Sequence, residues 1–243
     1  HFIALLLTFT IFASGCLIRP LSGVVFGYIG DKFGRKKALV YSIGLITIAT
    51  TLMGALPTYA TVGVAAPLLL VICRLLQGVA VSGEEIGAAI MLAENASPKQ
   101  QNFVGSIILS SVYLGLFLGA ATALVMHLFT SPEFMLTWGW RIPFLSTSVL
   151  GFLALKIRLS AFDSREFSNL VEQNQVIKNP TARVFKMHSG ALLRTVGISS
   201  ILAVAIYLFA VYLPSYYTNV AGFSSTQSLS ISCVFLFIVS MLV

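Results

Sequence analysis

Long apolar stretches separated by short clusters of charge dominate this chain of 243 residues. Apolar residues make up 57% of the sequence and charged residues 9%, whereas about a quarter of the residues in soluble domains are charged. Each apolar stretch approaches or exceeds the roughly 20 residues that a membrane-spanning helix needs. Because backbone polar groups in lipid must be hydrogen-bonded within the segment, these stretches must be helices. The sequence therefore predicts an all-α protein, a polytopic bundle of transmembrane helices.

We expect seven spans, with boundaries that the charge clusters and the turn residues between them define. Small residues recur within these stretches, which allows transmembrane backbones to pack closely where lipid supplies no hydrophobic driving force. The expected spans cover residues 2–30, 38–56, 62–93, 103–128, 140–157, 191–213 and 226–243.

The 15 basic residues exceed the 8 acidic ones, which gives a formal net charge of +7. Twelve of the 15 lie in or beside alternate loops, and the positive-inside rule places these loops in the cytoplasm. The basic balance therefore reflects topology and is no sign of nucleic-acid binding. The partners that we expect are the lipid bilayer and a small-molecule solute, and the sequence leaves the oligomeric state open.

The sequence gives no indication of an enzyme. Cys16, Cys73 and Cys233 lie in apolar stretches without CxxC spacing or a nearby histidine cluster, which argues against disulfides and against a metal site. No catalytic Ser/His/Asp, Cys/His or phosphate-loop arrangement is present in the sequence. We therefore expect neither catalytic activity nor a bound cofactor.

The turn between the first two expected spans has the most specific pattern in the chain. An aspartate and four cations occupy seven residues here, so this segment must lie outside the hydrocarbon. Glycines in the turn allow helix ends to approach closely, and the aspartate can face a helix N-terminus or an arginine. Residues 27–37 read Gly-Tyr-Ile-Gly-Asp-Lys-Phe-Gly-Arg-Lys-Lys.

This turn resembles the loop between helices 2 and 3 of the major facilitator superfamily. Further motifs occur in order and narrow the resemblance to the metabolite:proton symporter branch, which includes proline/betaine transporters. These motifs are Arg19-Pro-Leu-Ser-Gly23, Arg74-Leu-Leu-Gln-Gly78, Ser82-Gly-Glu84, Glu94-Asn-Ala-Ser-Pro98 and Trp138-Gly-Trp-Arg-Ile-Pro-Phe144.

The resemblance implies that the chain covers helices 2–8 of a twelve-helix transporter. Residues 1–157 would then be an incomplete N-terminal half, 158–189 the central cytoplasmic loop, and 190–243 the start of the C-terminal half. The implied location is the cell (inner) membrane. The resemblance also implies that the turn gates alternating access through Gly27, Asp31, Lys32, Gly34, Arg35 and Lys36.

The implied activity is symport of a small polar metabolite with protons as the coupling ion. An osmolyte such as proline or betaine is the favoured solute. A carboxylate:proton symporter is the alternative, and a truncated membrane remnant without transport activity is a third possibility.

Ionisable residues inside expected spans are candidates for proton coupling or for lining the solute cavity, because a charge in lipid is costly. Arg74 precedes Glu85 by 11 residues. On a helix, this spacing puts the two side chains on nearly the same face, about 16 Å apart along the axis. Glu84 points about 80° away from Arg74, but it matches the acid of the family motif. We favour Glu84 over Glu85, and either acid could instead form a structural ion pair. Arg19 either lines the cavity or extends to the headgroups.

A departure from the family pattern and a polar segment both concern the cytoplasmic side. Glu94 is expected to join Asp31 and Arg35 in a charge network, but the family's arginines after this motif are replaced here, which predicts a weaker gate. The polar stretch after Arg158 spaces its apolar residues almost as a helix does, which predicts a surface helix that Pro180 ends.

Overall fold

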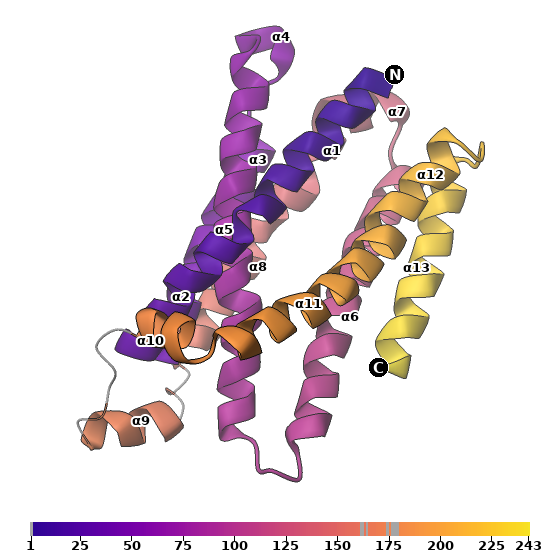
Figure 1. Cartoon of the computed structure of the whole chain (residues 1–243). Helices are drawn as coiled ribbons and strands as arrows, with labels where there is room; N and C mark the ends of the chain where they lie inside the picture. Colours follow the sequence, from indigo (N-terminus) through magenta and orange to yellow (C-terminus); the bar gives the residue numbers. More distant parts are fainter. Residues whose placement is uncertain (1, 161–162, 164, 174, 176–179) are drawn as a thin grey trace. The chain divides into compact units, whose positions relative to one another are not determined.

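The computed structural model describes residues 2–160, 163, 165–173, 175 and 180–243, and these are helical apart from their connections (Figure 1). Seven segments are long and apolar enough to cross a membrane, which confirms the all-α fold and the seven expected spans. The elements are α1 (Phe2–Leu17), α2 (Arg19–Phe33), α3 (Arg35–Ala55), α4 (Tyr59–Val62), α5 (Ala65–Asn95), α6 (Gln101–Phe129), α7 (Pro132–Phe134), η1 (Met135–Gly139), α8 (Arg141–Ser160), α9 (Arg165–Glu172), α10 (Pro180–Met187), α11 (Ser189–Tyr207), η2 (Leu208–Tyr212), α12 (Leu213–Asn219) and α13 (Ser225–Leu242).

The chain divides into two compact units that do not follow chain order. The first unit comprises His1–Ala96 and Trp140–Thr181, and the second comprises Ser97–Gly139 and Ala182–Val243. The division of the chain into two halves and a central loop, which the sequence suggests, stays a prediction.

The first expected span consists of two helices, α1 and α2, which meet at Ile18. Pro20 lies in the first turn of α2. A proline lacks the N–H that would continue the α1 hydrogen-bond ladder, so the helix is interrupted at this point. The interruption does not end the span, since Leu6–Phe33 as a whole remains apolar enough to cross a membrane.

Helix α3 lies at the centre of the first unit and packs against α2, α5 and α8. Its buried side chains include Leu39, Ser42, Ala49 and Met53, which are all at most 2% exposed. At the far end of α3 from the charged turn, Arg141 Nη1 donates to the Gly54 carbonyl at 2.8 Å. This bond satisfies a carbonyl that the end of the helix leaves free.

Helix α5 contacts α1, α2 and α3 and is the longest helix of the chain, with 31 residues. At 1.5 Å per residue it extends for about 46 Å, which exceeds the roughly 30 Å of bilayer hydrocarbon. The helix is therefore longer than an untilted span needs, and Glu94 lies in its last turn. Close approach of α1 requires a glycine at position 78, because a Cβ there would overlap the Gly15 carbonyl oxygen.

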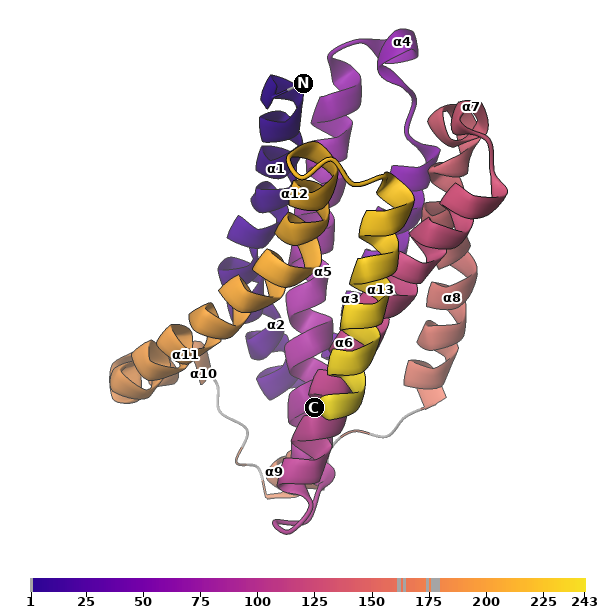
Figure 2. The same ribbon diagram turned by 90° about the vertical axis from the view of Figure 1, so that its right-hand side faces the viewer.

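In the second unit, α13 packs along α6, and both Figure 1 and Figure 2 show the two helices side by side. The sixth span, Ser189–Asn219, contains the π-helical segment η2 directly before α12. Pro214 opens α12, and the wider π turn accommodates the missing N–H of this proline. The Ser228 hydroxyl of α13 donates to the Pro214 carbonyl at 2.7 Å and joins the two helices.

The segment after α8 differs from the expected single surface helix. Helix α9 ends at Glu172, and Pro180 begins the separate helix α10. The prediction that Pro180 ends a helix is therefore wrong. Proline is favoured in the first turn of a helix, where its missing N–H would have no partner within the helix.

Substitution of Gly78 should destabilise the first unit. We expect Gly78→Ala to lower the free energy of unfolding by about 1–3 kcal/mol, because the new methyl group meets backbone that cannot move aside. Gly119→Ala on α6 is the matched control, since a Cβ there meets nothing within 4 Å. Melting temperatures of the detergent-purified proteins test this. Equal melting temperatures of the two variants would contradict the close α1–α5 packing.

Candidate functional site

The ends of α2, α3 and α5 meet at a charge network that we call the end network, formed by Asp31, Arg35, Glu94 and Asp163. Arg35 Nη1 lies 2.7 Å from Asp31 Oδ1, one helical turn earlier in the sequence. The same guanidinium donates to Glu94 Oε1 through Nη2 at 3.0 Å and Nε at 3.3 Å. One arginine thus holds carboxylates from two other helices.

Asp163, from the segment after α8, completes this network at the N-terminus of α3. Its Oδ1 accepts a hydrogen bond from the backbone N–H of Lys36 at 2.9 Å. A carboxylate at a helix N-terminus satisfies a free donor and interacts favourably with the helix dipole. The approach needs Gly34, whose φ is +106° and whose Cβ, if present, would overlap the Asp163 carboxylate. The end network therefore joins four segments of the first unit.

The predicted gating residues do not all belong to this network. Asp31 and Arg35 contribute side chains, Lys36 contributes its backbone N–H, and Gly34 provides the space. Lys32 lies instead against aromatic rings, with Nζ 5.0 Å from the ring centroid of Tyr28. A Cβ at position 27 would meet nothing within 4 Å, so the close approach expected of that glycine is not seen among the described residues.

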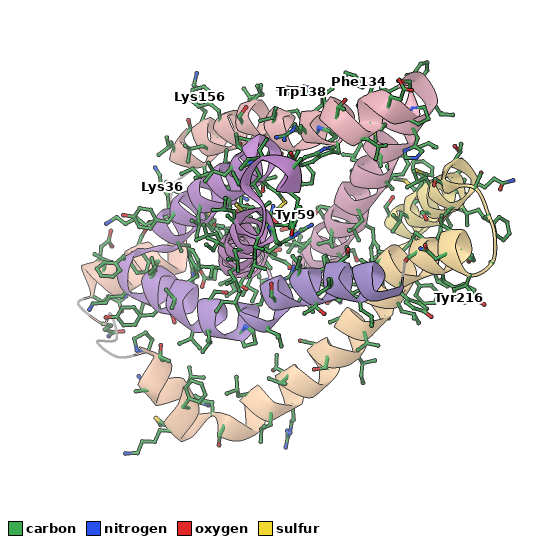
Figure 3. All side chains as sticks on the ribbon, turned by 90° about the horizontal axis from the view of Figure 1, so that it is seen from above. Lys36, Tyr59, Phe134, Trp138, Lys156 and Tyr216 are labelled. Carbon is green, nitrogen blue, oxygen red and sulfur yellow. The ribbon has the colours of Figure 1, made fainter. Side chains whose placement is uncertain are left out.

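A second ion pair, which we call the Glu84–Arg158 pair, joins Glu84 of α5 to Arg158 in the last turn of α8. Arg158 Nη2 donates to Glu84 Oε1 at 2.7 Å, and the Ser42 hydroxyl of α3 donates to Oε2 at 3.2 Å. The two charged side chains are 27% and 28% exposed. Lys156, two residues before Arg158, points away from the neighbouring helices (Figure 3). Arg158 thus turns toward α5, whereas the exposed Lys156 does not.

A third polar group, the Arg74 cluster, consists of Arg74, Gln77, Thr50 and Phe12. Arg74 Nη1 donates to Gln77 Oε1 at 3.2 Å, and Gln77 Nε2 donates to the Thr50 hydroxyl of α3 at 2.8 Å. The guanidinium lies 5.7 Å from the ring centroid of Phe12 on α1. The cluster therefore combines a cation and an amide from α5, an aromatic ring from α1 and a hydroxyl from α3.

The structure brings Glu84 to Arg158 and not to Arg74. Glu84 and Arg74 are ten residues apart on one helix, which separates them by about 15 Å along its axis. Glu85 is exposed, so the two adjacent acids have different surroundings. Arg19 is half-buried where α1 meets α2, and its carbonyl accepts a hydrogen bond from the Ser82 hydroxyl at 3.2 Å.

Sequence reasoning did not identify Arg158, Ser42, Gln77 and Thr50 as site residues. A signal existed for Arg158, because an acid within a span requires a cation and Arg158 lies near the end of a neighbouring span. Ser42, Gln77 and Thr50 have no such signal, since uncharged polar residues are common in transmembrane helices.

Comparison with known proteins identifies the family, because the model of the Major Facilitator Superfamily matches residues 2–243. The chain belongs to this superfamily. It is 36% identical to the shikimate transporter of Escherichia coli K12 over 219 residues, which are 89% of this chain and 50% of that protein. It is 34% identical to the proline/betaine transporter of Salmonella typhimurium LT2 over 238 residues, which are 94% of this chain and 47% of that protein.

The solved structures give the same fold for this superfamily member. A crystal structure of a D-xylose-proton symporter superposes with a TM-score of 0.73 at 20% identity, covering 95% of this chain and 55% of that one. The chain spans about half the length of the curated relatives it matches and has a partial major facilitator fold. It is thus a multi-pass membrane protein of a small-solute transporter family and not an enzyme.

Removal of Arg158 alone should lower the stability of the protein more than removal of both members of the Glu84–Arg158 pair. Arg158→Gln leaves the Glu84 carboxylate half-buried without its cation, whereas Glu84→Gln/Arg158→Gln leaves no uncompensated charge. We expect the single variant to melt at a lower temperature than the double variant. Lys156→Gln is the control, since this exposed cation on the same helix should have little effect. A double variant less stable than the Arg158 variant would contradict the pairing.

Proposed function

We propose that this chain is part of a symporter that couples the movement of a small polar metabolite to protons by alternating access. The observation that carries this proposal is that the single spanning helix α5 places Arg74 and Glu84 in separate polar clusters within the first unit. Charged groups inside spans are costly unless they serve binding or coupling. Relatives named as transporters of proline, betaine and shikimate, together with the D-xylose-proton symporter fold, support this class of function.

The Arg74 cluster is the proposed contact for the solute. Proline, betaine and shikimate all carry a carboxylate, and the planar guanidinium of Arg74 matches a carboxylate through paired donors. An aromatic ring such as Phe12 suits a quaternary or secondary ammonium by cation–π attraction. A zwitterionic osmolyte such as proline or betaine offers both groups, and it is therefore the favoured solute.

Glu84 is the proposed proton-coupling residue, with Arg158 as the partner that controls it. A carboxylate beside a guanidinium favours its charged form, and separation of the two groups would favour proton uptake. A conformational change that moves α8 relative to α5 therefore couples protonation to the state of the transporter. Glu85 remains the alternative acid and Arg19 a further cavity candidate.

The end network is the proposed cytoplasmic gate. Helix ends joined by charge pairs can separate together when the transporter changes state, which is the behaviour expected of a gate. The high local density of basic residues around this network supports a cytoplasmic orientation in the inner membrane.

A carboxylate:proton symporter remains the second candidate, since the 36% identity to the shikimate transporter favours it. In that case Arg74 binds the solute and the aromatic ring contributes only packing. A chain without transport activity is the third candidate.

Uptake measurements distinguish these candidates. In cells expressing the protein that contains this chain, we expect labelled betaine or proline to accumulate under an inward proton gradient and a protonophore to abolish the accumulation. Arg74→Lys should reduce uptake at least tenfold, because the ammonium cannot reproduce the paired donors of the guanidinium. Faster accumulation of shikimate would favour the carboxylate symporter. Absence of uptake for all three solutes would favour the inactive chain.

Substitution of Glu84 tests the coupling step. Glu84→Gln removes the titratable group but keeps its size and its contact with Ser42. We expect accumulation driven by the proton gradient to fail in this variant, whereas solute exchange at equal pH continues, since exchange moves no net proton. Glu85→Gln is the matched control on the adjacent, exposed position. Normal gradient-driven accumulation with an unchanged pH profile would show that Glu84 has a structural role only.

A further inference from the structure

The segment from residue 173 to the end of the chain contains no acidic residue but four cations. These cations are Lys178, Arg183, Lys186 and Arg194, of which the last three are described and exposed. Among the described residues, no carboxylate lies within ion-pair distance of Arg183, Lys186 or Arg194. Because neither this segment nor a described neighbour supplies a counter-charge, the cations are available to anions outside the chain.

Two of the cations lie on one side of the short helix α10, beside an uncovered apolar arc. With 100° per residue, Met187, Val184 and Phe185 occupy one arc of the helix, and Arg183 and Lys186 lie together next to it. The apolar side chains are 63%, 40% and 54% exposed, so the residues that the structure describes leave much of this arc uncovered. This arrangement is typical of helices that lie in the plane of a membrane surface.

The connection to α11 places α10 directly before a segment that can cross a membrane. Only His188 separates α10 from α11, and its φ of −129° and ψ of 25° are not helical. The ribbon changes direction between the two helices (Figure 1). Ser189 is the first residue of a helical segment long and apolar enough to cross a membrane, so Met187 lies two residues before that segment. An apolar arc at this position in the chain can enter the boundary between headgroups and acyl chains without any larger rearrangement.

We propose that α10 is an interfacial helix that binds anionic lipid headgroups. Val184, Phe185 and Met187 insert between the lipids, and Arg183 and Lys186 contact the headgroup phosphates. Charge complementarity identifies the occupant, because a face with two cations and no acid attracts an anionic surface and not a basic one. This inference does not depend on which solute the protein transports.

Spin labels at two positions of α10 measure the depth of each face. In a background with Cys16, Cys73 and Cys233 replaced by alanine, one label is attached at Val184→Cys and another at Ala182→Cys, about 160° around the helix. The full chain is reconstituted in nanodiscs of phosphatidylcholine with phosphatidylglycerol, or of phosphatidylcholine alone. We expect the label at position 184 to collide several-fold more often with oxygen than with a water-soluble nickel chelate, and the label at 182 to show the reverse.

Charge substitutions then test the role of the headgroups. The oxygen preference at position 184 should be greater with phosphatidylglycerol than without it. Arg183→Gln/Lys186→Gln should abolish this difference, and high salt should abolish it in the protein without these substitutions. Lys37→Gln/Lys99→Gln is the control, because it removes two exposed cations from other parts of the chain.

Three results would overturn the proposal. Equal nickel accessibility at positions 182 and 184 in both lipid mixtures would show that α10 does not lie in the membrane surface and that something other than lipid covers its apolar arc. Persistence of the phosphatidylglycerol effect in the α10 charge variant would show that Arg183 and Lys186 do not bind headgroups. An equal loss of the phosphatidylglycerol effect in the Lys37→Gln/Lys99→Gln control would show that only the net charge of the chain matters.

Discussion

The guanidinium of Arg35 is the interaction on which the charged end of the first unit depends. It belongs to α3 and contacts Asp31 of α2 and Glu94 of α5, so one side chain connects three helices. An arginine suits this role because its donors lie in a fixed plane and it stays charged at any physiological pH. Asp163 adds the segment after α8 by binding the N-terminus of α3. Polar contacts between helix ends add to the packing of the spans themselves, which lipid does not drive by a hydrophobic force.

The same constraint explains the positions of the other charges. Glu84 lies about 15 Å along α5 from Glu94, within a segment that is long and apolar enough to cross a membrane. A carboxylate in such a segment needs a partner, and Arg158 and Ser42 provide one from α8 and α3. Arg74, a further 15 Å or so along the helix, is held by Gln77 and the Phe12 ring. Three of the four charged residues of helix α5, Arg74, Glu84 and Glu94, thus lie at different heights along it, and each contacts a different set of neighbours, whereas Glu85 is exposed.

The second unit is built differently, since its helices contact each other through apolar and hydroxyl side chains. The rings of Phe117 on α6 and Phe237 on α13 lie 5.4 Å apart, and Ser228 joins α13 to α12. Its cations are concentrated near the start of α11, where the chain enters the membrane. In the part of this unit that the structure describes, no ion pair joins two helices.

The sequence by itself determined the class of fold, the number of spans and the family. Apolar length and the motif at residues 27–37 are local properties, so they can be read without knowledge of the packing. It also identified Asp31, Arg35 and Glu94, because the family motif fixes them. Only the tertiary structure decided that Glu84 pairs with Arg158, 74 residues away, and that Asp163 requires Gly34. Helical periodicity gives the face of a residue on its own helix, whereas its partner depends on how neighbouring helices cross and on their relative heights, which no local pattern encodes.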